Sequence, residues 1–576
     1  MAVDRTQGYV PSDEEVQLYR DDYRLFSELQ LYRSVFAAQW EEAARLILPT
    51  SLNTFYYGAY NFPGMKKTAE QVDASGALAL SQFVAIVDSL VTPKNQIWHG
   101  LKADPAVMKN RDVREYFDTV RDILFDYRYR PIGNFHGQNT NNWQSLGAFG
   151  NATMFVDKLD SRWHHGSKGL RYKGVPLGET FYGENHQGIV DTMIRWFRRT
   201  AAQAAQAWGY DRLPGTLITA LDKDSQTPFD FLHVVRPRED YEPKRLDVKG
   251  LPFASRYWCV QGESMMAPGS GFRVFPYAVS RYDQTPGECY GRGPAQIVLP
   301  ALKTINAQKR TFLKVGHRIA DPVYLIGDDG LMSLDQRPGA INPGGMSADG
   351  KPLVGKLIEG NIQVTLEMMQ EERSIIDNTF FTPLFKTLTD HPDMTATQVI
   401  ELMNERGMLI APTLGRQHSE YVGGLVEREI DLLSEMGALP PQPTALREAR
   451  GEYQITDTSP LSMAAKANQL AGFNRWVSQL HEWASVSGDQ SILDPVNFEA
   501  ATPDAGRIQN VQEAWISTPQ QIEAKAKNRA RAQQQAAANE AAPGQAALLS
   551  AQAKIQKLNP GAQSAGQPQP QPQGVQ

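Results

Sequence analysis

The chain has 576 residues, of which 41% are hydrophobic and 21% are charged, a composition typical of a soluble protein large enough for several lobes. Its net charge of -6 argues against a protein that binds nucleic acid over its whole surface, because affinity for duplex DNA grows with the number of phosphates neutralised. The same balance permits a channel through which DNA slides, since such a channel needs only weak attraction.

Cysteine content and hydropathy narrow the class further. Cys259 and Cys289 are too few for a disulfide framework and too far apart for a zinc knuckle, so we expect reduced thiols in a cytosolic setting. The first twenty residues are polar and acidic, unlike a signal peptide. No apolar run approaches the ~20 residues that a membrane span requires.

A long helix is predicted near the N-terminus. Ser12-Asp13-Glu14-Glu15 is a capping-box sequence, and the helical pattern that it opens continues to Leu48 and stops at Pro49. Four arginines alternate with acids along this helix, namely Arg20, Arg24, Arg33 and Arg45. This alternation favours a solvated helix face with i,i+4 ion pairs over a nucleic-acid contact.

Further helices make the first 150 residues mainly helical. Apolar residues between Leu80 and Val91 recur at helical spacing, and Pro93 ends the pattern. Residues 112–127 and 142–146 add two more helical segments.

From residue 153 to about 290, short strands and turns predict an α+β lobe. The β-like runs are 153–156, 231–235, 257–260 and 272–277, and residues 190–208 are predicted as an interposed helix. Trp163-His164-His165 does not indicate a metal site, because adjacent residues on a strand point to opposite faces.

The centre of the chain is predicted to contain two helices of opposite charge. The first, over residues 296–320, has no acid and carries Lys303, Lys309, Arg310, Lys314 and Arg318. The second, over residues 364–379, carries Glu367, Glu371, Glu372 and Asp377 against a lone Arg373. We expect the helices to lie side by side, with charge pairing either within one chain or between neighbouring subunits. Pro300 either starts the regular part of the first helix or bends it.

Turn-rich sequence separates these two helices. Residues 322–362 are rich in Gly, Pro and Asp, interrupted by strand-like runs such as 323–326, which indicates a small β-containing lobe on a helical stalk. After the second helix, residues 380–393 form a loop.

A third, long helix follows that loop. Thr395 and Gln398 form its capping box, and its apolar periodicity persists to about Met436, with a kink marked by Gly407 and Pro412.

The C-terminal part is predicted to be helical and then disordered. A helix covers 461–483, and another begins at Thr502-Pro503 and runs to about residue 538. Residues 566–576 consist mainly of Gln, Pro and Gly, without an aromatic residue to anchor them.

No motif nominates catalytic chemistry. Gly-Lys-Ser/Thr, Gly-x-Ser-x-Gly and His-Glu-x-x-His are all absent. The carboxylates at Asp222/Asp224 and Asp328/Asp329 lie in turn-rich sequence without the further acids that a two-metal nuclease requires. We therefore expect neither an enzyme nor a bound cofactor or metal.

The order of the central elements, with Met394-Thr395-Ala396-Thr397-Gln398-Val399, resembles the portal proteins, or head-to-tail connectors, of short-tailed bacteriophages. Residues 43–49 and the run Trp143-x-x-Leu146-Gly147-x-x-Gly150-Asn151-Ala152 agree with it. The resemblance extends from about residue 13 to 530 and implies an α+β, portal-type fold with a wing, a helical-hairpin stem, a small β-containing clip, a long kinked helix and an α-helical crown.

The resemblance also implies boundaries for these parts. They are the wing at 1–290, stem helix 1 at 291–320, the clip at 321–363, stem helix 2 at 364–379, a tunnel loop at 380–394, the long kinked helix with a return to the wing at 395–460, the crown at 461–538 and a largely disordered tail at 539–576.

The function so implied is a homododecameric ring at one capsid vertex, through which double-stranded DNA passes during packaging and ejection. The implied partners are the terminase large subunit, the major capsid and scaffolding proteins and the tail adaptor proteins, with no membrane. The implied location is the virion, with the host cytoplasm during assembly. Twelve stalks packed at ~10 Å would leave a bore of roughly 28 Å.

The implied site residues lie in the stem and after it. Lys303, Arg310 and Lys314 share one helix face by their spacing and are predicted to contact the channel or a neighbouring subunit, as are Lys309, Arg318, Glu367, Glu371 and Glu372. Phe381, Lys386 and Thr387 fall in the tunnel loop. Two alternatives stay open: another ring-forming adaptor, although adaptors are usually far shorter, and a DNA-processing enzyme.

Overall fold

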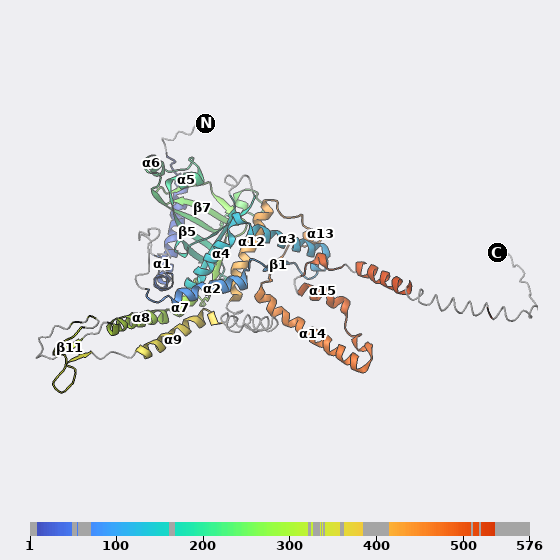
Figure 1. Ribbon diagram of the computed structural model, residues 1–576. Helices are drawn as coiled ribbons and strands as arrows, with labels where there is room; N and C mark the ends of the chain where they lie inside the picture. Colours follow the sequence, from blue (N-terminus) through green and yellow to red (C-terminus); the bar gives the residue numbers. More distant parts are fainter. Residues whose placement is uncertain are drawn as a thin grey trace, which may run out of the picture. The chain divides into compact units, whose positions relative to one another are not determined.

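The computed structural model describes residues 8–48, 55, 71–159, 168–320, 324–326, 335, 337, 340–356, 362–383, 414–508, 511–517, 520–535 and 554 (Figure 1). The chain divides into two compact units. One comprises Met1–Phe498 with Ile508–Asn510, and the other Glu499–Arg507 with Val511–Gln576. Within the described ranges, no helix is both long and apolar enough to cross a membrane.

Helices dominate the start of the first unit, as predicted. They are α1 (Asp13–Ile47), α2 (Ser75–Val91), α3 (Arg111–Tyr129) and α4 (Phe135–Phe149), with the short strand β1 (His99–Lys102) between α2 and α3. The Ser12 hydroxyl caps α1 by accepting the Glu15 amide at 3.3 Å. The Glu15 carboxylate accepts hydrogen bonds from the Tyr9 hydroxyl and the Met265 amide, both at 2.6 Å, so the start of α1 is fixed to the sheet.

Two antiparallel sheets follow, which confirms the predicted α+β character. The larger has the order β4-β5-β6-β7-β8, with β9 also paired to β7, and the smaller has the order β10-β2-β3. Their strands are β2 (Asn151–Lys158), β3 (Leu170–Gly174), β4 (Thr180–Glu184), β5 (Val190–Thr200), β6 (Pro228–Pro237), β7 (Phe253–Cys259), β8 (Ser264–Met265), β9 (Ser270–Phe272) and β10 (Tyr277–Arg281).

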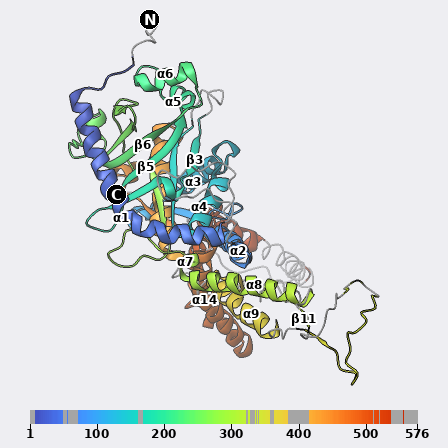
Figure 2. The ribbon, with the colours of Figure 1, turned by 90° about the vertical axis from the view of Figure 1, so that its left-hand side faces the viewer.

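Helices cover both faces of the larger sheet. Successive strand residues point to opposite faces. Trp196 and Leu232 therefore pack with Phe26 of α1, whereas Phe197 and Phe231 pack with α5 (Ala201–Trp208) and α6 (Gly215–Lys223). Figure 2 shows α1 along one side of strands β5 and β6.

The prediction of a helix over 190–208 is wrong for its first eleven residues, which form β5. A strand with apolar cover on both faces lacks the alternation of polar and apolar residues that identifies most strands. Only Ala201–Trp208 is helical. The run 272–277 is also not one strand, because β9 ends at Phe272 and β10 begins at Tyr277.

Arg33 is not part of a solvated face of α1, which corrects a second prediction. It is 2% exposed, and its Nη1 donates hydrogen bonds to the carbonyls of Leu177, Gly178 and Thr180 at 2.9 to 3.0 Å. Its guanidinium carbon also lies 3.9 Å from the centre of the Phe181 ring. This buried arginine fixes the turn before β4 against α1.

The centre of the chain forms the predicted helical hairpin. Its elements are α7 (Pro294–Ile297), α8 (Leu299–Ala320), β11 (Tyr324–Ile326), β12 (Val354–Lys356) and α9 (Ile362–Thr379). Pro300 is the second residue of α8, so it starts the regular helix and does not bend it. The strands β11 and β12 pair antiparallel, and α8 lies beside α9 in both views (Figures 1 and 2).

The first unit continues with helices beyond the hairpin. They are a π-helical turn (His418–Val422), α12 (Gly423–Glu435), α13 (Thr444–Glu448) and α14 (Pro460–Ser487), and the strand β13 (Gln454–Asp457) pairs with β1. The predicted kink at Gly407 and Pro412, and the residues Trp163-His164-His165, lie outside the described residues.

The predicted continuous helix from Thr502 to residue 538 is wrong. α15 (Phe498–Ile508) begins earlier and contains Pro503 in its interior. A 3-10 turn at Glu513–Trp515 and a separate helix over residues 520–535 follow it. The predicted disordered end at 566–576 lies outside the described residues.

Candidate functional site

The base of the α8–α9 hairpin is attached to the segment that precedes α2. Asn306 on α8 is buried, and its Oδ1 accepts hydrogen bonds from the Val72 and Asp73 amides at 2.8 and 3.1 Å. Arg373 on α9 donates to the Asp73 carboxylate at 2.9 Å and to the Ser75 hydroxyl at 3.2 Å. One short segment therefore binds both helices of the hairpin.

These contacts stabilise the charged form of the Asp73 carboxylate. Burial alone would raise the pKa of Asp73, but hydrogen bonds from Ser75 and Arg373, together with the Arg373 charge, lower that pKa below its ordinary value. Arg373 was visible in the sequence only as the one basic residue of an acidic helix. Its role depends on a partner far away in the sequence, which no local pattern reveals.

The corner between α4 and β2 supports the start of the hairpin. A Cβ at Gly147 would lie 2.6 Å from Leu80 Cδ1, and one at Gly150, where φ is +72°, would lie 2.3 Å from the Arg292 carbonyl carbon. The Asn151 amide group forms two hydrogen bonds of 2.8 Å with the Gly291 backbone. The motif from Trp143 to Ala152 therefore allows the backbone that leads into α7 to pack closely against the corner between α4 and β2.

The predicted basic residues of α8 are largely at the surface. Lys303, Arg310, Lys314 and Arg318 are exposed, and Lys309 is half-buried with its Nζ 5.4 Å from the centre of the Phe312 ring. Lys303 Nζ lies 2.5 Å from Glu42 Oε1 of α1. One predicted stem contact thus has a partner within its own chain, on the N-terminal helix α1 and not on the acidic helix α9.

The acidic helix α9 packs through its apolar side. Met369 and Ile376 are buried in the same core as Leu302 and Ile305 of α8, whereas Glu367 and Glu371 are exposed and Glu372 is half-buried. On α8 and α9, large apolar side chains that remain 41% to 50% exposed are those of Leu313, Ile319, Met368 and Ile375. Exposed apolar groups on a projecting element are typical of surfaces that contact other chains.

The residues after α9 are only partly described. Phe380 is buried with its ring 5.9 Å from that of Phe83, and Phe381 is half-buried with φ of +60°. The other predicted residues of the tunnel loop and of the long-helix cap, Lys386, Thr387, Thr395 and Gln398, lie outside the described residues.

Arg281 of β10 connects the smaller sheet to the π-helical turn. It is 3% exposed and donates two hydrogen bonds of 2.9 Å to the Glu420 carboxylate. It also contacts Glu184 of β4 and donates to the Gly188 carbonyl at 3.2 Å. Burial alone would lower the pKa of Arg281, but its hydrogen bonds to Glu420 and Glu184 raise it. π-helical turns are frequent at functional sites, and no sequence spacing predicted this one.

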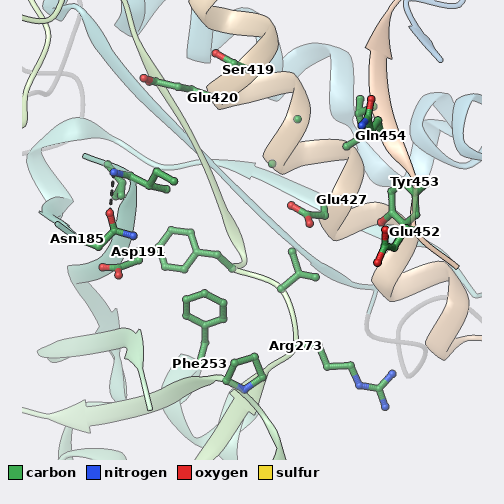
Figure 3. Close-up of a pocket in the computed structure, with 18 of the residues that line it drawn as sticks. Asn185, Asp191, Phe253, Arg273, Ser419, Glu420, Glu427, Glu452, Tyr453 and Gln454 are labelled. Carbon is green, nitrogen blue, oxygen red and sulfur yellow. Dashed lines mark hydrogen bonds between the residues drawn. The ribbon is translucent and has the colours of Figure 1, made fainter. Parts of the chain in front are cut away.

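A cavity of about 1440 Å³ lies beside this turn (Figure 3). In the view of Figure 3, Asn185 and Asp191 line the left side of the cavity and Phe253 lies at its lower edge. Glu427 and the segment from Glu452 to Gln454 line the right side. Among the described residues, those that line the cavity include neither His nor Cys.

Two residues that line this cavity have raised pKa values. Burial, and secondly the Asp431 charge, raise the pKa of Glu427. Burial, with the charges of Glu427 and Asp431, raises the pKa of Tyr453 to about 12. The lining combines carboxylates, such as that of Asp191, with guanidinium groups, such as that of Arg273, and with apolar side chains. Across the part of the chain that the structure describes, no group of three or more His, Cys, Asp or Glu residues could hold a metal ion.

Comparison with known proteins adds an independent finding. The family described as "Bacteriophage head to tail connecting protein" matches residues 23–516. A probable portal protein of Bordetella phage BPP-1 is 24% identical over 535 residues, covering 90% of this chain and 92% of the relative. The portal protein of Salmonella phage epsilon15 is 24% identical over 539 residues, covering 91% and 93%. Among solved structures, "Neck of empty GTA particle computed with C6 symmetry" matches with a TM-score of 0.32 and 11% identity, over 70% of this chain and 86% of that one.

Proposed function

Because this chain belongs to the family of bacteriophage head-to-tail connecting proteins, we propose that it forms a ring at one capsid vertex through which double-stranded DNA passes. DNA would move inward during packaging and outward during ejection. The proteins of this family are structural components of the virion. The chain would therefore act by its placement in the ring and would catalyse no reaction. The two phage relatives named as portal proteins are matched over more than nine-tenths of their length, which supports a complete portal function.

The observation that supports a ring most directly is the hairpin of α8 and α9. It is attached at its base by Asn306 and Arg373 and exposes apolar and charged side chains along its length. Identical projections form a closed ring when each contacts the next through two different surfaces. Twelve hairpins at ~10 Å spacing would leave a bore of roughly 28 Å, wide enough for duplex DNA.

In this proposal the parts of the chain have distinct places in the ring. The wing is 1–290, the stem helices are 291–320 and 364–379, the clip is 321–363, the tunnel loop is 380–394, the long helix with its return to the wing is 395–460, the crown is 461–538 and the tail is 539–576. The terminase large subunit would dock on the clip and tail adaptor proteins would replace it. The major capsid and scaffolding proteins would contact the ring during assembly in the host cytoplasm.

The stem charges fit contacts between neighbouring subunits. Arg310, Lys314 and Arg318 are exposed on α8, and Glu367 and Glu371 are exposed on α9. Opposite charges on the two helices of one hairpin would meet those of the next hairpin, beside exposed apolar groups such as Met368. Lys386 and Thr387 of the tunnel loop would contact the DNA phosphates.

Negative-stain electron microscopy of the purified full-length protein tests this function. The expected result is rings with a central hole, and antibody labelling of virus particles should mark one vertex. A protein that stays monomeric under every assembly condition and is absent from particles would contradict the proposal.

A further inference from the structure

A short basic helix near the C-terminus has a charge opposite to that of the whole chain. The helix over residues 520–535 belongs to the second unit and is orange-red in Figure 1. It contains four basic residues, Lys525, Lys527, Arg529 and Arg531, and one acid, Glu523, so its net charge is 4 − 1 = +3. The complete chain has a net charge of -6.

This helix has no apolar face to bury. All its side chains are exposed except that of Ile522, which is half-buried. Alanine, glutamine, lysine and arginine all have high helix propensity, which explains why the segment is helical without a core. A helix that is polar all round depends on i,i+4 pairs or bridges domains through solvent, and this one leaves its basic side chains at the surface. The charge of these residues is therefore available to a partner.

The basic residues are only partly neutralised within the chain. Lys527 Nζ lies 2.7 Å from Glu523 Oε1, with both side chains about two-thirds exposed, and Lys525 donates a hydrogen bond to the Ser517 hydroxyl at 2.9 Å. In the described ranges, no acidic side chain forms an ion pair with Arg529 or Arg531. Like charges four residues apart on a helix repel each other, and an anionic partner would relieve that repulsion.

The spacing of the charges indicates the shape of that partner. Residues two apart are about 200° apart around a helix axis, whereas residues four apart share a flank. Lys525 and Arg529 thus lie on one flank and Lys527 and Arg531 on the nearly opposite flank, with the small Ala526 and Ala530 between them. The major groove of duplex DNA is about 12 Å wide, admits one α-helix and has a row of phosphates on each side.

We propose that the helix over residues 520–535 binds double-stranded DNA by contacting phosphates on both sides of a groove. The inference rests on the proposed function in one respect, because that function brings duplex DNA to this protein. Alanines between the basic flanks allow the backbone to approach the groove. Phosphate contacts position a protein on DNA without reading its sequence, so the binding is independent of sequence.

The test compares full-length proteins in a DNA-binding titration at several salt concentrations, with a fluorescent duplex of mixed sequence as the probe. The variant carries Lys525→Gln, Lys527→Gln, Arg529→Gln and Arg531→Gln, which keep helix propensity. Removing four phosphate contacts should reduce the slope of log affinity against log salt by about 3 to 4 and weaken low-salt binding by more than tenfold. The charge-matched control carries Arg20→Gln, Lys94→Gln, Lys109→Gln and Lys244→Gln at exposed positions and should retain the wild-type slope.

Three outcomes would overturn the inference. They are a wild-type protein that does not bind the duplex, equal salt slopes for the variant and the control, and displacement of the DNA by poly-L-glutamate as effective as displacement by unlabelled duplex. The last outcome would assign the helix to acidic proteins. Electron microscopy of the same preparations separates this inference from the ring proposal. If the variant forms rings and binds DNA as the wild type does, only the role of this helix is contradicted.

Discussion

Arg373 of α9 donates a hydrogen bond of 2.9 Å to the carboxylate of Asp73, a residue 300 positions earlier in the chain. The Asp73 side chain is 5% exposed and that of Arg373 is 37% exposed. Together with Asn306, this pair attaches the hairpin to the helical part that precedes it. Since the hairpin is the proposed wall of the channel, its attachment determines whether it projects in one orientation.

Replacing Arg373 with Ala should lower stability by about 1 kcal/mol, because solvent screens the exposed side of the pair. The effect should depend on pH. The pKa of Asp73 is lower in the folded protein than in the unfolded chain, where it is about 4. The ion pair therefore contributes fully to stability above that unfolded pKa, and the contribution is lost as the pH falls through the folded pKa. Thermal melts of both proteins at neutral and acidic pH should therefore differ at neutral pH and converge in acid. A constant difference across that range would contradict the role of the pair.

The pair Arg128–Glu429 offers a sharper test of buried charge. Both side chains are 0% exposed, Arg128 Nε donates to Glu429 Oε1 at 2.9 Å, and the Tyr172 hydroxyl donates to the same oxygen at 2.7 Å. Arg128→Met should destabilise by about 3–5 kcal/mol, because it leaves a buried carboxylate without its cation. Adding Glu429→Leu should recover part of that loss, as measured by chemical denaturation. A double variant less stable than the single variant would show that the charge is not the cause.

Gly150 should tolerate substitution far less well than Gly188. Both have positive φ, of +72° and +76°, but a Cβ at Gly188 would meet nothing within 4 Å, whereas one at Gly150 would collide with the Arg292 backbone. Gly188→Ala should lower the free energy of unfolding by only about 1–2 kcal/mol, the cost of a left-handed backbone conformation for a residue with a Cβ. Gly150→Ala should lose more, because the chain entering α7 must move. Equal shifts in melting temperature would mean that this close approach is unimportant.

Charge reversal in the stem should separate stability within the subunit from assembly. Lys303→Glu places a second negative charge beside Glu42 and should lower the stability of the subunit by only about 0–1 kcal/mol, because the pair is exposed. Adding Glu42→Lys should restore that stability. Lys314→Glu should leave the melting temperature unchanged and reduce the yield of rings or of DNA-filled particles. Lys244→Glu, in an exposed loop, is the matched control. Unchanged yields with Lys314→Glu would remove that residue from the proposed interface.

The two thiols should be inert in the folded protein. Cys259 and Cys289 are both buried, and burial raises their pKa values to about 11 and about 12. Since the thiolate is the reactive form, about one Cys259 thiol in a thousand would be ionised near pH 8, before steric protection is considered. A thiol-reactive chromophore should therefore react with both residues in denaturant and slowly without it. Fast reaction in native buffer would show that either residue is accessible.

Local patterns in the sequence predicted most of the helical elements. The apolar spacing in α2 and the charge bias of α8 and α9 depend on residues within a few positions of one another, and such patterns are readable without a structure. The motif from Trp143 to Ala152 marked the corner beside the hairpin, although its meaning came only with the contact between Gly150 and Arg292. The family was likewise apparent from the order of these segments.

Only the tertiary structure decided which distant residues meet. Neither the hydrogen bond from Arg33 to the Leu177 carbonyl nor the attachment of Arg373 to Asp73 follows from local spacing, because the two residues lie more than 140 positions apart in each pair. The strand β5 was mistaken for part of a helix because helices cover both faces of its sheet. A sequence determines local conformation through neighbouring residues, whereas burial, pairing and charge compensation depend on surfaces that come together only when the chain folds.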